Sequence, residues 1–379
     1  MRLSRRGDIP PFVVMEMSKA AFEMERAGRP VFHLEVGQPS TRAPGLARAA
    51  AAHALDAELL AYTDANGIPP LRHRIARFYR DRYGVEVSPD RVIATTGSSA
   101  GFVLTFLAAF DAGARVAIAA PAYPCYRNVL SAVDVEVLPI PVGPETHYQV
   151  TPEILQAAGR LDGVIVASPS NPTGSIIDAA AMQALTAWCR AAGVTLISDE
   201  IYHGLEYATP AVTAAAYDEN VIVINSFSKY FSMTGWRIGW MIVPDAFVRA
   251  IEKLGQNLYI SPPTLSQIAA TAAFDATEEL DGHVRRYREN REIVLAALPE
   301  LGITRFAPPD GAFYVYADVS HLAADSVKFC RDLLETTGVA VTPGVDFDRE
   351  RGGSTLRISY ARDPETVAEA MRRMIQFVR

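Results

Sequence analysis

Short apolar runs alternate with longer helical patterns through the middle of this chain, and this alternation restricts the folds open to it. The runs are apolar along nearly their whole length, as strands covered on both faces are. Helical patterns such as residues 100–110 and 179–192 lie between them, and Asp178 and Gly193 would cap the second. The order predicts an α/β fold, a mostly parallel central sheet flanked by helices. The predicted strands are residues 91–95, 115–120, 135–140, 163–167, 194–198, 221–225 and 239–243.

The pattern changes after about residue 261, which predicts a smaller α+β domain. A long charged helix is expected over residues 279–298, strands over 312–317 and 355–360, and a last helix from Pro364. A chain of 379 residues has room for two or three domains. We therefore expect three parts: an N-terminal segment that joins the small domain (1–44), a large domain that carries the binding site (45–275) and the small C-terminal domain (276–379).

The charge of the chain argues against nucleic acid and membrane partners. Its formal net charge is −7, and its Lys and Arg residues are dispersed rather than gathered in a basic stripe. The first residues are basic but lack the apolar stretch of a secretory signal, and no run reaches the ~18 apolar residues of a membrane span. A cytoplasmic location is expected, with small-molecule chemistry as the leading class of function.

The cysteines predict neither a disulfide framework nor a metal site. Cys125, Cys189 and Cys330 lie far apart in the sequence and share no close spacing with any histidine. We expect reduced thiols and no structural metal.

Polar residues follow several of the predicted strands, where ligands bind in open α/β sheets. Ser98 and Ser99 follow one strand and begin a helix, so that hydroxyl and backbone N–H groups would form an anion site there. Asn171 leaves another strand within Ser-Asn-Pro-Thr-Gly. Each segment alone has a plainer interpretation, since a serine before a helix is commonly an N-cap and Pro and Gly commonly make turns.

Two charged residues follow the next strands. Asp199 ends an apolar strand, where an unpaired carboxylate would be costly to bury, so it is either a simple cap or has a cationic partner such as a protonated pyridine nitrogen. Lys229 follows Ser226-Phe227-Ser228. Most lysines are on the surface, but burial and a nearby arginine, Arg237, would lower the pKa of this one and make its amine a nucleophile for an aldehyde.

Arg357 lies in a predicted strand, on the face opposite Leu356 and Ile358. It either faces solvent or lines the cleft. In the cleft, its guanidinium would match a substrate carboxylate in a bidentate contact.

Taken in order, these motifs resemble the class I/II family of fold-type I aminotransferases, which depend on pyridoxal phosphate. The resemblance covers nearly the whole chain, and its specificity comes from the number and order of the motifs. They are Val36-Gly37-Gln38-Pro39, Tyr62-Thr63 with Gly67 and Leu71-Arg72, Gly97-Ser98-Ser99-Ala100, Pro121-Ala122-Tyr123, Asn171-Pro172-Thr173-Gly174, Asp199-Glu200-Ile201-Tyr202, Ser226-Phe227-Ser228-Lys229, Arg237 and Arg357.

The resemblance implies a role for each matching residue. Lys229 would bind the cofactor as a Schiff base and then carry the proton at the substrate Cα. Asp199 would pair with the pyridine nitrogen, while Tyr202 and Asn171 would hydrogen-bond the phenolic oxygen of the ring. Tyr123 would stack on the ring. The phosphate would be bound by Ser98, Ser99, Ala100, Ser226 and Arg237, and by Tyr62 of a second subunit in a homodimer.

The resemblance also implies a site for an amino acid and a 2-oxo acid. Gly37, Asn171 and Arg357 would bind the substrate, Gly37 and Arg357 through its α-carboxylate. Residues 10–14 resemble a segment that folds over the substrate side chain, although they could also be an apolar arm packed on the core. With Tyr126 they would favour a neutral or aromatic amino acid. For the distal carboxylate of a dicarboxylic substrate, the only candidate cations are Arg42 and Arg127.

The sequence leaves two other functions open. A β- or γ-lyase, or a synthase, on the same fold would have the same cofactor residues. An aminotransferase-like ligand sensor would have a DNA-binding region, and the few residues before residue 10 do not suggest one.

Overall fold

The structure, a computed structural model, describes residues 4–379. Its largest element is a seven-stranded sheet in the order β2-β8-β7-β6-β5-β3-β4, in which β8 runs antiparallel to both neighbours and the other pairs are parallel. The predicted mostly parallel sheet is confirmed, with strand ends displaced by one residue in places. The strands are β2 (Val92–Thr95), β3 (Arg115–Ala120), β4 (Glu136–Pro141), β5 (Gly163–Ala167), β6 (Thr195–Asp199), β7 (Ile222–Ser226) and β8 (Gly239–Ile242).

Alternation along the strands gives the sheet two apolar faces. In β5 and β6, Ile165 and Ile197 belong to one cluster, whereas Val164 and Leu196 belong to the other. The first face packs against α4 (Ser98–Ala109), α5 (Pro124–Ala132) and α8 (Asp245–Leu258), and the second against α3 (Pro69–Tyr83) and α7 (Ala179–Ala192). The caps predicted for α7 are present, because Asp178 accepts a hydrogen bond from Ala181 N and Gly193 has φ +66°.

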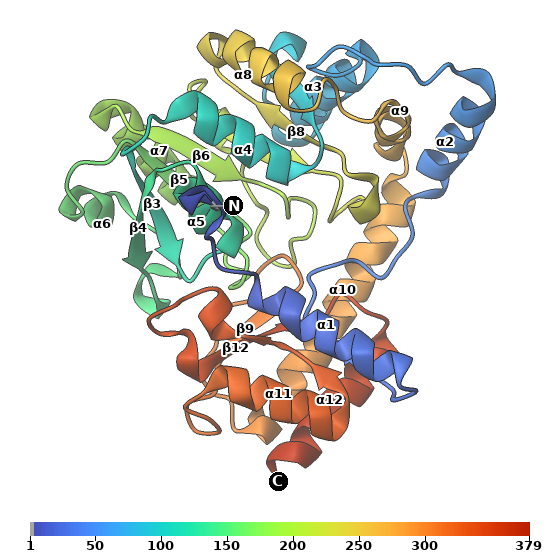
Figure 1. Cartoon of the computed structure of the whole chain (residues 1–379), viewed down its shortest axis with the longest axis vertical. Coiled ribbons are helices and arrows are strands. Elements are labelled where there is room, and N and C mark those ends of the chain that lie inside the picture. The colour runs from blue at the N-terminus through green and yellow to red at the C-terminus, as the bar shows by residue number, and fades with distance from the viewer. Residues whose placement is uncertain (1–3) are drawn as a thin grey trace.

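A smaller sheet lies beside the large one, in the lower part of Figure 1. Its strands β11 (Thr342–Pro343), β12 (Thr355–Ser359) and β9 (Tyr314–Asp318) are antiparallel. A short parallel pair joins β1 (Phe32–His33) to β10 (Val339–Ala340). The helices of this part are α1 (Val13–Arg26), α10 (Thr277–Ala297), α11 (Ser326–Thr337) and α12 (Pro364–Val378), and α10 extends from the large part into the small one (Figure 1).

The remaining helices are α2 (Gly45–Ala57), α6 (Pro152–Ala157) and α9 (Thr264–Ala273). The structure thus has the predicted α+β part, with α1 packed against its strands. The domain boundaries at residues 44 and 275 stay a prediction. Within residues 4–379, every helix is too short or too polar to span a lipid bilayer.

Candidate active site

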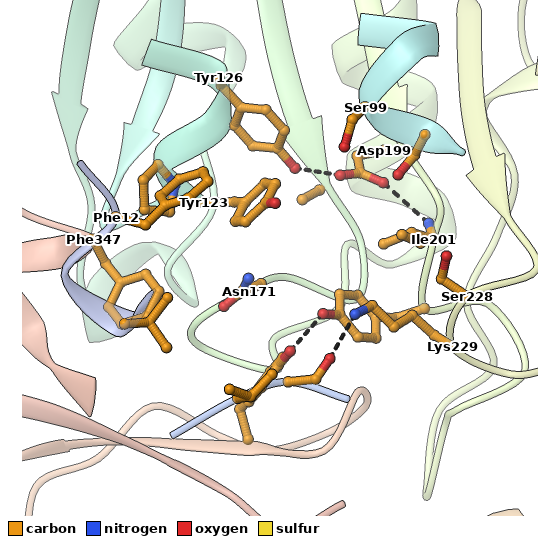
Figure 2. Close-up of a pocket in the computed structure, with 18 of the residues that line it drawn as sticks. Phe12, Ser99, Tyr123, Tyr126, Asn171, Asp199, Ile201, Ser228, Lys229 and Phe347 are labelled. Atoms are coloured by element: carbon orange, nitrogen blue, oxygen red, sulfur yellow. Dashed lines mark hydrogen bonds between the residues drawn. The ribbon is translucent and has the colours of Figure 1, made fainter. Parts of the chain in front are cut away.

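A cavity of about 230 Å³ lies beyond the carboxyl ends of the parallel strands, between the large and small sheets. Its wall is drawn in Figure 2, where Asp199 and Lys229 lie on one side and Phe12 and Phe347 on the other. The structure brings most of the predicted site residues together here. Those that line the cavity are Gly37, Ser98, Ser99, Tyr123, Asn171, Asp199, Tyr202, Lys229, Arg237 and Arg357.

Aromatic packing fixes the loop that carries Lys229. The loop leaves β7 through Phe227, which packs against Phe231 and Trp240 with ring centroids 4.8 and 4.9 Å away. Backbone hydrogen bonds from Met233 N to Phe227 O and from Ser232 N to Lys229 O close the turn. Lys229 is therefore held between two buried aromatic residues, and its Nζ donates a 2.6 Å hydrogen bond to the carbonyl oxygen of Gly37.

The surroundings of Lys229 favour its uncharged form. Burial, with the positive charges of Arg357 and Arg237, lowers the pKa of the amine to about 8, and the carboxylate of Asp199 opposes this only in part. The amine is thus a usable nucleophile and base near neutral pH.

The carboxyl group of Asp199 is 4% exposed and held at both oxygens. Tyr126 donates its hydroxyl to Oδ2, and Ile201 N donates to Oδ1 at 3.1 Å, as the dashed lines in Figure 2 show. Burial raises the pKa of Asp199 to about 6, while these hydrogen bonds and the charge of Lys229 act in the opposite direction. A buried carboxylate at the cavity wall would be stabilised by a cationic group on a bound ligand.

Ser98, Ser99, Ser228 and Arg237 form a group of donors at the N-terminus of α4. Gly97, with φ +81°, precedes this helix, and a Cβ there would lie 2.3 Å from Nη2 of Arg237. The missing side chain therefore lets the guanidinium lie against the end of the helix. Helix N–H groups, hydroxyls and a guanidinium together make an anion site suited to a phosphate.

Arg357 is 3% exposed and faces the cavity rather than solvent. Nη1 donates to Oδ1 of Asn171 at 2.8 Å, and Nη2 donates to the carbonyl oxygen of Glu35. The guanidinium carbon lies 4.4 Å from the ring centre of Tyr314 and 4.8 Å from that of Phe347. The cation is fixed on several sides, so the open alternative of a solvent-facing arginine is ruled out.

Tyr202 and Gly37 meet at Tyr314. The hydroxyls of Tyr202 and Tyr314 are 2.6 Å apart. A Cβ at Gly37 would lie 1.7 Å from the Tyr314 hydroxyl, so only glycine fits here. Burial raises the pKa values of both phenols, which therefore remain hydrogen-bond donors at neutral pH.

Three predicted residues do not line the cavity: Ala100, Ser226 and Tyr62. Ala100 is one residue further along α4 than Ser99. Ser226 donates its hydroxyl to Ile238 O and accepts from Ser228 N, so it supports Ser228 from behind. Tyr62 is 80% exposed on the surface of this single chain. Their predicted roles stay predictions.

The two arginines considered for a second carboxylate also lie outside the lining. Arg42 is exposed, and Arg127 donates to the backbone oxygen of Asp346. The predicted N-terminal segment does contribute, since Phe12 and Val14 line the cavity and Phe12 stacks on Tyr123 with ring centroids 5.9 Å apart. The hydroxyl of Tyr126 is directed to Asp199 rather than to this outer wall.

The lining residues that the sequence analysis did not predict include Ser228, Tyr314, Asp346 and Phe347. Ser228 belongs to the lysine motif and is adjacent to Lys229, but the phosphate contact was predicted for Ser226 instead. For the other three, no signal in the sequence places them in the cavity, because they come from the small part of the fold and are brought in by tertiary packing.

The donor set fits pyridoxal phosphate. Lys229 offers an amine for the aldehyde, Asp199 a buried carboxylate for a protonated ring nitrogen, and the group at α4 an anion site for the phosphate. Tyr123 presents an aromatic ring to the same cavity (Figure 2).

Comparison with known proteins agrees with this chemistry. The family described as aminotransferase class I and II matches residues 29–374. A valine–pyruvate aminotransferase of Mycobacterium tuberculosis is 52% identical over 378 residues, which cover 98% of this chain and 97% of that protein. An aspartate aminotransferase of Pyrococcus horikoshii is 32% identical over 386 residues, which cover 99% of this chain and 98% of that protein.

A solved structure points the same way. The crystal structure of an aminotransferase from Mycobacterium tuberculosis matches with a TM-score of 0.98 and 51% identity, covering 100% of this chain and 99% of that one. The resemblance expected from the motifs is confirmed, and so are the fold type, the enzyme class and the cofactor. With a matching family sequence, a matching fold and a cavity of the required chemistry, the chain belongs to the class I and II aminotransferases, enzymes that use pyridoxal phosphate to move an amino group between an amino acid and a 2-oxo acid.

Proposed function

We propose that this aminotransferase takes a neutral aliphatic amino acid as its donor, with valine as the first candidate and pyruvate as the first candidate for the acceptor. The observation that carries the proposal is that the outer cavity wall is apolar. It is formed by Phe12, Val14, Met15 and Phe347. The name of the relative that is 52% identical, a valine–pyruvate aminotransferase, supports the same choice.

The charges in the cavity support a substrate with a single carboxylate. Among the lining residues that the structure describes, the cationic side chains are Lys229, Arg237 and Arg357. Lys229 is needed for the chemistry and Arg237 for the phosphate, which leaves Arg357 for one carboxylate. A distal carboxylate would meet apolar side chains and Asp346, and burying it there without a cation would be costly.

We propose a separate role for each residue at the end of the cavity that contains Lys229. When bound, the cofactor supplies an acceptor for the electrons left at the substrate Cα when its proton departs. Arg357 binds the α-carboxylate and thereby orients the Cα–H bond towards Lys229. The Nζ of Lys229 would then accept the proton from Cα and hold it for delivery to the cofactor carbon that Lys229 had bound.

The other polar residues stabilise charge. The carboxylate of Asp199, which Tyr126 and Ile201 hold in place, would pair with the protonated ring nitrogen of the cofactor. Tyr202 and the NH2 group of Asn171 would donate to the phenolic oxygen of the cofactor, since Oδ1 of Asn171 already accepts from Arg357. Ser98, Ser99, Ser228 and Arg237 bind the phosphate.

We further propose a homodimer in which Tyr62 reaches the phosphate site of the partner subunit. Tyr62 lies among large exposed apolar side chains, including Leu59 and Ile260, 90% and 46% exposed. Hydrogen bonds from Thr264 Oγ1 to Ala61 O and from Thr63 N to Ser261 Oγ bring these segments together. Apolar patches of this kind commonly mark interfaces. The cytoplasmic location stays a prediction.

Replacing the lysine should abolish turnover without abolishing cofactor binding. Lys229→Ala removes both the nucleophile and the base, so transamination should fall by at least roughly 1000-fold, as expected when such a group is lost. Equilibrium dialysis should still detect bound cofactor through the Asp199 and phosphate contacts. Lys253→Ala, an exposed lysine of α8, is the matched control and should keep its activity. Substantial turnover by Lys229→Ala without added amines would refute the assignment.

The reaction of cofactor-free protein with pyridoxal phosphate should depend on pH through Lys229. Only the uncharged amine adds to an aldehyde, and a lowered pKa means that the uncharged fraction grows as the pH passes through about 8. The rate, followed by absorbance, should rise to this pH and then level off. A rate that still climbs tenfold per unit between about pH 9 and 10, as for an ordinary lysine, would show that the amine is not desolvated.

The donor proposal is tested by a panel of amino acids. The holoenzyme is mixed with each donor in the absence of an acceptor, and the loss of the lysine-bound cofactor absorbance is followed. Valine and similar neutral donors should give larger kcat/KM values than aspartate and glutamate by at least about 10-fold, the factor that corresponds to roughly 1.4 kcal/mol. A higher value for either acidic donor would overturn the proposal.

The dimer is tested by sedimentation and by one substitution. The protein should sediment as two chains of 41.2 kDa, and Tyr62→Phe should weaken cofactor binding without changing that mass. A single-chain mass at working concentration, or unaltered cofactor affinity in the variant, would contradict the shared site.

A further inference from the structure

The N-terminal arm, residues 10–15, is fastened over the outer end of the cavity by one carboxylate. Asp346 follows β11 in a short helical turn, Gly344–Asp346, and its side chain reaches the beginning of α1. Oδ1 accepts from Val13 N at 3.1 Å, and Oδ2 accepts from Val14 N at 3.2 Å. Asp346 is 1% exposed and belongs to the cavity lining, as does Val14. A residue from the far end of the chain thus caps the first long helix.

Arg127 of α5 lies against the same residue. Its Nη2 donates to the backbone oxygen of Asp346, and its Nε is buried without a hydrogen-bond partner among the described residues. Burial and the charge of Arg349 lower the pKa of Arg127 to about 10, whereas Asp346 and Asp348 oppose the decrease. Arg127 is therefore still charged at neutral pH, and it contacts the same residue whose side chain holds the arm.

We propose that Asp346 is a specificity-determining residue, which discriminates against amino donors with a second carboxylate by presenting its own carboxylate at the outer end of the cavity and by masking the charge of Arg127. This inference rests on the proposed neutral-donor function and names the group that enforces it. Phe12, Val14 and Phe347 would accept the side chain of a neutral donor, whereas Asp346 repels an anionic one.

The position of the carboxylate makes this repulsion hard to avoid. Both oxygens are held by backbone N–H groups at the N-terminus of α1, where a negative charge is favoured, so the side chain cannot turn away without uncapping the helix. An acidic substrate would need a cation in the same place to offset the loss of its hydration. Arg127 is directed to the Asp346 backbone and is not part of the cavity wall.

The test is Asp346→Asn in the holoenzyme, because asparagine keeps the shape and one acceptor while removing the charge. The ratio of kcat/KM for valine to that for aspartate should fall at least tenfold relative to the wild-type enzyme. Inhibition constants report binding without turnover. In the variant, succinate should become a stronger inhibitor relative to isovalerate than it is in the wild-type enzyme. Adding Arg127→Met to Asp346→Asn should restore the part of the discrimination that comes from masking, since the charge of Arg127 is then gone while the carboxylate of Asp346 is still absent.

Asp325→Asn is the matched control. Asp325 caps α11 by accepting from Val327 N and Lys328 N, so the variant loses a capping charge of the same kind away from the cavity. It should leave both ratios unchanged.

The possible results separate the two proposals. A wild-type enzyme that prefers aspartate overturns the neutral-donor function and this inference together. If the wild type prefers neutral donors but Asp346→Asn keeps the same ratios, only the role of Asp346 is overturned. A parallel loss of activity on both donors, with a lower melting temperature and unchanged ratios, would also overturn it, since Asp346 would then be a helix cap and nothing more.

Discussion

The site depends on two groups of opposite charge that are kept out of water at the end of one sheet. Asp199 ends β6 and Lys229 follows β7, and because these strands are adjacent and parallel the fold brings both residues to the same edge. Burial then acts on them in opposite directions, raising the pKa of the acid and lowering that of the amine. Hydrogen bonds from Tyr126 and Ile201 hold the carboxylate in place, while the loop between Phe227 and Phe231 holds the amine. The reactivity of the lysine therefore follows from packing around it.

The large sheet could be predicted nearly residue by residue, because its strands are continuous apolar runs between clear turn signals. The β5 strand, residues 163–167, and the α7 helix, residues 179–192, begin and end where expected. The polar residues that follow such strands could be placed at one edge for the same reason. The smaller strands were located less closely, and β1, β10 and β11 were not expected, since two-residue strands carry no periodicity.

The site was harder to predict where its residues come from distant parts of the chain. Glu200 is adjacent to Asp199, yet its carboxylate accepts hydrogen bonds from Thr213 and Ala214 outside the cavity. Only the position at which β6 ends, at Asp199, distinguishes the two acidic residues. Ser226 and Ser228 present the same difficulty in the lysine motif. Tyr314, Asp346 and Phe347 reach the cavity only because the small sheet packs against the large one, and local sequence does not encode that placement.

The contact between Asp346 and the beginning of α1 also determines when this part of the cavity can form during synthesis. The two partners are separated by 333 residues, which is almost the full span of the protein. During synthesis the first helix is therefore made long before Asp346, the residue that caps it. The ribosome must synthesise nearly the whole polypeptide before Asp346 can hold the beginning of α1, so a nascent fragment that already contains Lys229 still lacks this part of the cavity.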